Sequence, residues 1–192
     1  PVLVPRPETE HLVEAALGHL QGRAQARVLD LCTGTGCVAI AIARNAPQAV
    51  LAATDIAPKA LSLAKANAAR HGVEIELCKG DLFGALRADA APFDVIVSNP
   101  PYVESLEWTS LSPVIRLHED PRALLAGPDG LSVLRRIIVE APKHLAPGGL
   151  LALEMGESQR DHVSALFDAH GFHQQRFIND LAGFSRIACA KQ

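Results

Sequence analysis

The tetrapeptide Asn99-Pro100-Pro101-Tyr102 combines residue types that can hold an NH₂ group. Two successive prolines restrict φ and remove two backbone donors, which leaves a stiff turn with free carbonyl acceptors. The side-chain oxygen of Asn99 and the carbonyl of Pro100 can accept the two hydrogens of a planar amide or amine, on which Tyr102 can stack. Such acceptors oppose the positive charge that builds on nitrogen as it attacks an electrophilic methyl group.

We therefore predict Asn99, Pro100 and Tyr102 as catalytic residues, and Asn99, Pro100, Pro101 and Tyr102 as substrate-binding residues. No strong general base is required, because the methylated nitrogen is acidic enough to lose its proton to water. The alternative is a purely structural turn, with Tyr102 packed in the core. We call these four residues the Asn99–Tyr102 turn.

A second group of residues surrounds a glycine turn that follows the first predicted strand. Gly34 and Gly36 allow a ligand to approach the backbone, and the N–H groups of the next helix point at an anion. Asp55 ends the second predicted strand, where a carboxylate can accept both hydroxyls of a ribose. These residues indicate a nucleoside site. Because Gly34 to Ala39 also fits the dinucleotide pattern, an NAD-type module stays open.

The elements that carry these residues alternate between short apolar runs and helical patterns, which is typical of βαβ units around a parallel sheet. Both groups follow strands, so both are expected at the carboxyl edge of that sheet. The connection 179–185 is too short for a helical crossover, so one of the last two strands should be antiparallel. The predicted helices are 8–20, 38–44, 58–70, 131–144 and 158–170, and the predicted strands are 27–31, 51–54, 74–77, 93–98, 150–154, 174–178 and 186–190.

The stretch 103–130 has no clear periodicity and directly follows the Asn99–Tyr102 turn. A long loop in that position is expected to be either functional or disordered. His118 lies in this loop and Glu154 ends a strand; we leave the roles of both open. Arg135 and Arg136 are adjacent on a helix and receive no role.

Composition supports a single α/β domain, because 48% of the 192 residues are hydrophobic but only 4% are aromatic. The net charge of −3 provides no field that would gather nucleic acid or an anionic membrane. No apolar run approaches the ~20 residues of a membrane span. No metal site is expected, and reduced thiols in a cytoplasmic protein are the default, because the cysteines form no C-x-x-C pair; they are Cys32, Cys37, Cys78 and Cys189.

Taken together, the motifs resemble the protein-(glutamine-N5) methyltransferases, the release factor glutamine methyltransferase family, over essentially the whole chain. The Asn99–Tyr102 turn is the central match. Beside it, Pro5-Arg6-Pro7-Glu8-Thr9-Glu10 is similar to the leading motif of the family, Asp30 to Gly36 to its first cofactor motif, Asp55 to its ribose acid, Asp81-Leu82-Phe83 to its adenine-side motif, and Asp180-Leu181-Ala182-Gly183 to a late motif.

The resemblance implies an α/β, Rossmann-like class I methyltransferase with a seven-stranded, mostly parallel sheet and one antiparallel strand. It implies S-adenosylmethionine as methyl donor and the glutamine of the Gly-Gly-Gln motif of peptide-chain release factors as acceptor. Residues 1–192 would form one catalytic domain, monomeric, without the N-terminal helical domain of the family, and with no membrane or nucleic-acid partner. The implied cofactor-binding residues are Cys32, Thr33, Gly34, Thr35, Gly36, Asp55, Asp81, Leu82 and Asn99.

Two positions depart from the family pattern. Cys32 stands where glycine is usual, and a cysteine fits the turn provided that its φ is negative. Leu82 stands where an aromatic residue often packs the adenine, which leucine can cover by apolar contact. Three other functions stay open: methylation of a ribosomal-protein glutamine, methylation of adenine N6 in DNA or RNA, and nucleotide binding by an NAD-type module.

Overall fold

The computed structural model describes residues 4–192, apart from the side chains of Ile115 and His118. Within this range seven strands form one sheet in the order β3-β2-β1-β4-β5-β7-β6. Strand β7 runs antiparallel to both of its neighbours, and the other described pairings are parallel. The strands are β1 (Arg27–Leu31), β2 (Val50–Asp55), β3 (Glu76–Lys79), β4 (Phe93–Ser98), β5 (Leu145–Glu154), β6 (His173–Asn179) and β7 (Ser185–Lys191).

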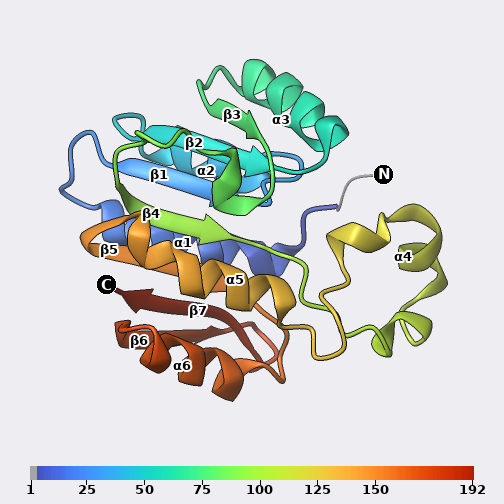
Figure 1. The fold of residues 1–192 in the computed structure, drawn as a ribbon. Coiled ribbons are helices and arrows are strands. Elements are labelled where there is room, and N and C mark those ends of the chain that lie inside the picture. The colour runs from blue at the N-terminus through green and yellow to red at the C-terminus, as the bar shows by residue number, and fades with distance from the viewer. Residues whose placement is uncertain (1–3) are drawn as a thin grey trace.

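Helices cover both faces of this sheet (Figure 1). Helices α1, α2 and α3 lie on one face, and α5 and α6 lie on the other, so the described chain has two apolar cores separated by the sheet. The central strands β1 and β4 are buried almost throughout, as expected for parallel strands between helical layers. The helices are α1 (Glu10–Leu20), α2 (Cys37–Asn45), α3 (Pro58–His71), α4 (Pro113–His118), α5 (Ser132–Glu140) and α6 (Arg160–Ala169).

The α/β fold, the mostly parallel sheet and the single antiparallel strand agree with the sequence prediction, and the differences have local causes. The predicted strand 74–77 lies at 76–79, because its register is set by pairing of Ala52–Asp55 with Glu76–Lys79. The predicted helix 131–144 ends at Glu140 and continues as the 3₁₀ turn η5 (Ala141–Lys143). Pro142 lies in that turn and has no N–H to continue an α-helix.

The stretch 103–130 contains more structure than its sequence pattern predicted. It includes α4 and the 3₁₀ turns η3 (Glu107–Thr109) and η4 (Pro121–Ala123), and its two ends meet in a bridge between Val103 and Leu125. Figure 1 shows this segment extending beyond the carboxyl end of β4. It therefore borders the edge of the sheet where ligands bind in open α/β folds.

Candidate functional site

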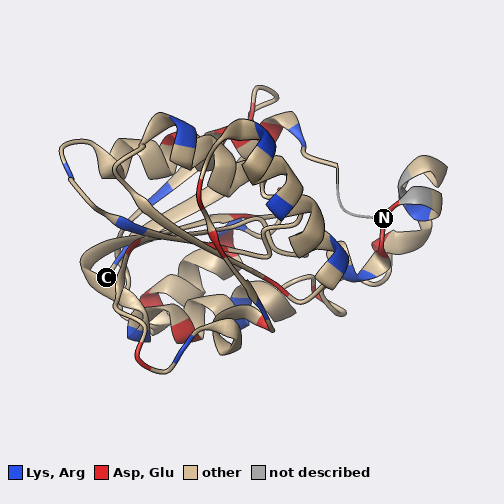
Figure 2. Ribbon diagram, turned by 90° about the horizontal axis from the view of Figure 1, so that it is seen from above, with Lys and Arg blue, Asp and Glu red and all other residues tan. Residues whose placement is uncertain are grey.

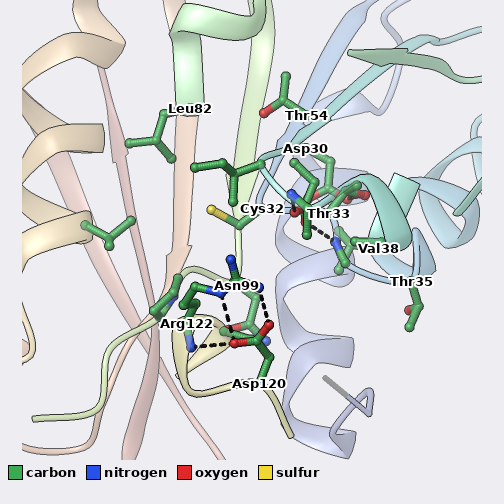
Figure 3. Close-up of a pocket in the computed structure, with 18 of the residues that line it drawn as sticks. Asp30, Cys32, Thr33, Thr35, Val38, Thr54, Leu82, Asn99, Asp120 and Arg122 are labelled. Carbon is green, nitrogen blue, oxygen red and sulfur yellow. Dashed lines mark hydrogen bonds and ion pairs between the residues drawn. The ribbon is translucent and has the colours of Figure 1, made fainter. Parts of the chain in front are cut away.

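A cavity of about 360 Å³ lies at the carboxyl ends of β1, β2 and β4 (Figure 3). The loops that follow all three strands contribute to its wall, as do residues of the chain before α1 and of η4. The tertiary structure thus brings the glycine turn and the Asn99–Tyr102 turn to one cavity. The sequence-predicted residues that line it are Cys32, Thr33, Gly34, Thr35, Asp55, Asp81, Leu82, Asn99 and Pro101.

Asp55 holds the glycine turn through a hydrogen bond to its backbone. Its carboxylate accepts hydrogen bonds from the backbone N–H of Gly34 at 2.9 Å and of Ala57 at 2.8 Å. Each carboxylate oxygen uses only one of these bonds, so each retains capacity for a further donor. Asp55 can therefore shape the turn and still accept the two hydroxyls of a ribose.

Gly36 is not among the described residues that line the cavity, and it has a packing role. Its φ is +79°, and a Cβ atom there would lie 3.0 Å from the Cβ of Ala64 on α3. Glycine is thus needed both for the left-handed backbone and for the close approach of α2 to α3.

Cys32 does not have the negative φ that we expected for a cysteine in this turn. Its φ is +57°, in the left-handed region that favours glycine. The Thr33 N–H nevertheless donates to the Thr54 carbonyl at 3.0 Å, so the turn after β1 is closed by a regular hydrogen bond to β2. Burial raises the pKa of the Cys32 thiol to about 12, which keeps the thiol protonated.

Two further polar groups face the same region. Asp30 is buried and accepts from the Thr33 hydroxyl at 2.6 Å and from the Ala39 N–H at 3.3 Å. Burial outweighs these hydrogen bonds and raises the pKa of Asp30 to about 7. The hydroxyl oxygen of Thr54 is buried and has no hydrogen-bond partner among the described residues. An unpaired buried hydroxyl beside a cavity is a natural contact for a polar ligand.

Another part of the cavity wall consists of two apolar side chains and an ion pair. Leu82 lies on the wall with Val133 of α5, where it can cover a flat ring by apolar contact. Asp81 pairs with Arg136 of α5 at 2.7 Å. Arg136, which received no role from the sequence, thus belongs to the wall of the cavity, because the helix that carries it packs against the face of the sheet beside it.

Charge in the cavity favours a cationic ligand over an anionic one. The charged lining residues are four aspartates and two arginines, and both arginines are paired within the wall: Asp81 with Arg136 and Asp120 with Arg122. Asp30 and Asp55 have no cationic partner among the described residues that line the cavity. The Asp55 carboxylate would repel a pyrophosphate, whereas it would attract a sulfonium or ammonium.

The Asn99–Tyr102 turn is only partly at the cavity. Asn99 and Pro101 line it, but Pro100 is buried and, like Tyr102, does not belong to the cavity lining of the described chain. Tyr102 packs against the hydrophobic core, and its hydroxyl lies 3.3 Å from Glu154 Oε1. Its predicted stacking on a substrate therefore requires a surface outside this cavity.

Glu154 anchors a hydrogen-bond network behind the turn. It is buried and accepts from the Thr9 hydroxyl at 2.7 Å, and Thr9 in turn lies 3.2 Å from Asn99 Nδ2. Burial is the main cause that raises the pKa of Glu154. Gln159 donates to the carbonyl of Tyr102 at 2.9 Å, which fixes the other end of the turn.

Several residues of the site escaped prediction. Thr9 carried a signal, since it lies in the Pro5–Glu10 motif, but Asp120 and Arg122 lie in a stretch without periodicity and Val133 in an ordinary helix pattern. The side chain of His118 lies outside the described residues. Within the described chain, no three His, Cys, Asp or Glu side chains gather as a metal site, and no helix has the length and apolar character needed to cross a membrane.

Comparison with known proteins identifies the family. Residues 12–127 match the methyltransferase small domain. A release factor glutamine methyltransferase of Gloeobacter violaceus is 43% identical over 97% of this chain and 65% of its own length, and one of Bordetella pertussis is 43% identical over 97% and 68%. The chain thus spans about two thirds of the length of these curated relatives.

A solved structure agrees with these relatives. The release factor-specific protein-(glutamine-N5) methyltransferase of Alicyclobacillus acidocaldarius is 30% identical, with a TM-score of 0.60 over 98% of this chain and 94% of that one. Sequence similarity over nearly the whole chain and the seven-stranded sheet lead to one assignment. The chain belongs to the release factor glutamine methyltransferase family and has its class I methyltransferase fold.

Proposed function

We propose that this chain transfers the methyl group of S-adenosylmethionine to the side-chain nitrogen of a protein glutamine, the glutamine of the Gly-Gly-Gln motif of peptide-chain release factors. The observation that carries the proposal is the position of Asn99 on the wall of a cavity that also contains the glycine turn and Asp55. At this cavity, a hydrogen-bond acceptor for an amide NH₂ group lies beside the residues of a nucleoside pocket.

The cavity residues fit S-adenosylmethionine. Asp55 would accept the ribose hydroxyls, and Leu82 with Val133 would cover the adenine. The glycine turn and the beginning of α2 offer N–H groups for the carboxylate. The unpaired hydroxyl of Thr54 and the acidic character of the wall suit a polar, cationic ligand.

Bound S-adenosylmethionine supplies an electrophilic methyl group on a sulfonium sulfur. The Asn99 oxygen would accept one hydrogen of the glutamine NH₂, which aims the nitrogen and opposes its developing positive charge. The carbonyl of Pro100, which stands in the chain between the lining residues Asn99 and Pro101, would accept the other hydrogen. The nitrogen would gain the methyl group as the carbon–sulfur bond of the donor breaks, and it would then lose one proton to water. Tyr102, held by Glu154, would border the glutamine from the side of the core.

Two of the alternatives are less well supported. An NAD-type module would place a pyrophosphate at the beginning of α2, in a cavity whose two arginines are already paired with aspartates. Methylation of adenine N6 would need a basic surface for nucleic acid, but the net charge is −3 and both signs are interspersed over the described chain (Figure 2). A ribosomal-protein glutamine remains a second candidate acceptor, because the same turn would hold it.

The test is incubation of the protein with labelled S-adenosylmethionine and, separately, with a release factor, ribosomal proteins and DNA. Label on the Gly-Gly-Gln glutamine is expected, and a release factor with that glutamine replaced by alanine is the matched control. Label in nucleic acid and none in protein would overturn the proposal. Calorimetry should detect binding of S-adenosylhomocysteine, whereas binding of NAD alone would exclude the methyltransferase.

A further inference from the structure

Asn99, Thr9 and Glu154 form a chain of hydrogen bonds at the carboxyl edge of the sheet. Asn99 follows β4 and Glu154 ends β5, and Ser98 pairs with Leu153 in the parallel register of these strands. The two side chains therefore leave neighbouring positions at the same edge of the sheet. Thr9, which precedes α1, lies between them and contacts both.

The number of available protons determines the direction of each hydrogen bond. A hydroxyl has one proton, and an ionised carboxylate can only accept. Because Thr9 Oγ1 lies 2.7 Å from Glu154 Oε2, the Thr9 proton is committed to Glu154. The Thr9 oxygen can then only accept from Asn99, which must turn its NH₂ end toward Thr9.

Because the NH₂ end of the Asn99 amide faces Thr9, the position of the amide oxygen is fixed as well. If the Asn99 amide were rotated by half a turn, its oxygen would face the Thr9 oxygen without a proton between them. The observed orientation instead leaves the Asn99 oxygen for a ligand in the cavity that Asn99 lines. Only this orientation makes the Asn99 side chain an acceptor for an NH₂ group.

We propose that Thr9 and Glu154 are positioning residues, which hold the Asn99 amide with its oxygen available to the acceptor glutamine. This inference rests on the proposed function for its catalytic consequence, but the orientation itself does not. Thr9 and Glu154 are both buried, with 6% and 1% of their surface exposed, so water does not compete freely for these bonds.

The orientation of the Asn99 amide depends on the charge of Glu154. Burial raises the pKa of Glu154, and hydrogen bonds from Thr9 and Tyr102 oppose that rise. The charged groups that act on Glu154 are Glu8, in the 3₁₀ turn η1 (Pro7–Thr9), and Arg186 of β7. A protonated Glu154 could donate to Thr9, which would free the Thr9 proton for the Asn99 oxygen. Turnover should therefore fall on the acid side as Glu154 gains its proton.

Thr9→Val keeps the shape of the side chain but removes the hydroxyl, and Thr9→Ser restores it. We expect Thr9→Val to lower kcat on the release factor by about tenfold to a hundredfold, with the affinity for S-adenosylhomocysteine changed less than the turnover. Thr9→Ser should recover most of the loss. Thr109→Val is the matched control, since Thr109 is exposed and its hydroxyl donates to the Leu106 carbonyl at 3.4 Å. Undiminished turnover of Thr9→Val, or an equal loss of cofactor affinity, would overturn the positioning role.

Glu154→Gln provides a second readout. Glutamine can still accept from Thr9 but does not titrate, so the acid limb of the kcat profile should disappear while some turnover remains. Persistence of the same acid limb in the variant would contradict the role of Glu154.

An NMR experiment separates the inference from the proposed function. The NMR signal of the Asn99 side-chain amide is assigned by its disappearance in Asn99→Asp. The amide proton that faces Thr9 should exchange slowly with water in the parent protein and fast in Thr9→Val. Equal exchange in both proteins would overturn the orientation, whatever the substrate. A parent protein with slow exchange but no release factor methylation would instead refute the proposed function alone.

Discussion

Arg6 Nη2 lies 2.6 Å from Glu119 Oε1, and this ion pair joins two chain segments that contribute to the cavity wall. Pro5 and Thr9 line the cavity from the first segment, and Asp120 and Arg122 line it from the second. The Glu119 side chain is 7% exposed, and its other oxygen has no partner among the described residues. Arg6 is therefore the main compensation for a buried carboxylate.

Arg6→Ala should destabilise the protein, because it leaves the Glu119 carboxylate buried without its donor. Urea unfolding should show a loss of about 1–3 kcal/mol, and the double variant Arg6→Ala/Glu119→Ala should lose less than the sum of the single variants. Arg87→Ala, which breaks an ion pair at the surface, is the control and should have no measurable effect. Additive losses in the double variant would show that the pair is not coupled.

Asp55→Ala should weaken S-adenosylhomocysteine binding roughly ten- to hundredfold, because hydrogen bonds to a charged group contribute about 1.5–3 kcal/mol. Loss of its bonds to Gly34 and Ala57 would loosen the turn in the same direction. Calorimetry measures the affinity, with the exposed Asp89→Ala as the control. An unchanged dissociation constant would remove Asp55 from the ribose site.

Asn99→Ala should abolish most turnover while cofactor affinity falls much less. A preorganised polar group that acts in the transition state accounts for about 10²–10³ in kcat, and its loss appears in kcat rather than in ground-state binding. Single-turnover methylation and calorimetry on the same variant check this. Comparable losses in both quantities would make Asn99 primarily a cofactor ligand.

Asp30 should make the unliganded protein less stable as pH rises. Its pKa is raised from 3.8 to about 7 in the folded state, so the folded protein binds more protons than the unfolded chain between these values. The contribution of Asp30 is fully present below pH 4 and is lost as pH rises to about 7. Urea unfolding from pH 5 to 8 should be flatter in Asp30→Asn, whose oxygen can still accept from Thr33. An equal slope in both proteins would exclude Asp30 as the cause.

Cys32→Gly should change the free energy of unfolding by less than about 1 kcal/mol. A left-handed backbone costs a non-glycine residue about 1–2 kcal/mol, but glycine adds entropy to the unfolded chain and loses the packing of the thiol. Cys32→Val should be clearly destabilising, because a β-branched residue fits φ of +57° poorly. Thermal unfolding of both variants decides this, and a tolerated valine would mean that the turn can change its conformation.

The amino-acid sequence by itself determined the fold class, because alternating apolar runs and helical patterns have few solutions other than a parallel sheet between helices. It also determined that the glycine turn, Asp55 and Asn99 lie at one edge, since each follows a strand and parallel strands share their carboxyl ends. The start of α3 at Pro58 and the antiparallel hairpin near the end followed from local chemistry in the same way.

Only the tertiary structure decided which side chains complete the site. Arg136 reaches Asp81 and Glu119 reaches Arg6 across long stretches of chain, and such contacts depend on how helices and loops pack rather than on a local pattern. The same holds for Thr9, whose hydroxyl lies between Asn99 and Glu154 because α1 packs against β4 and β5. A sequence pattern places residues along elements, but the direction of a hydrogen bond is set by the partners that packing brings within reach.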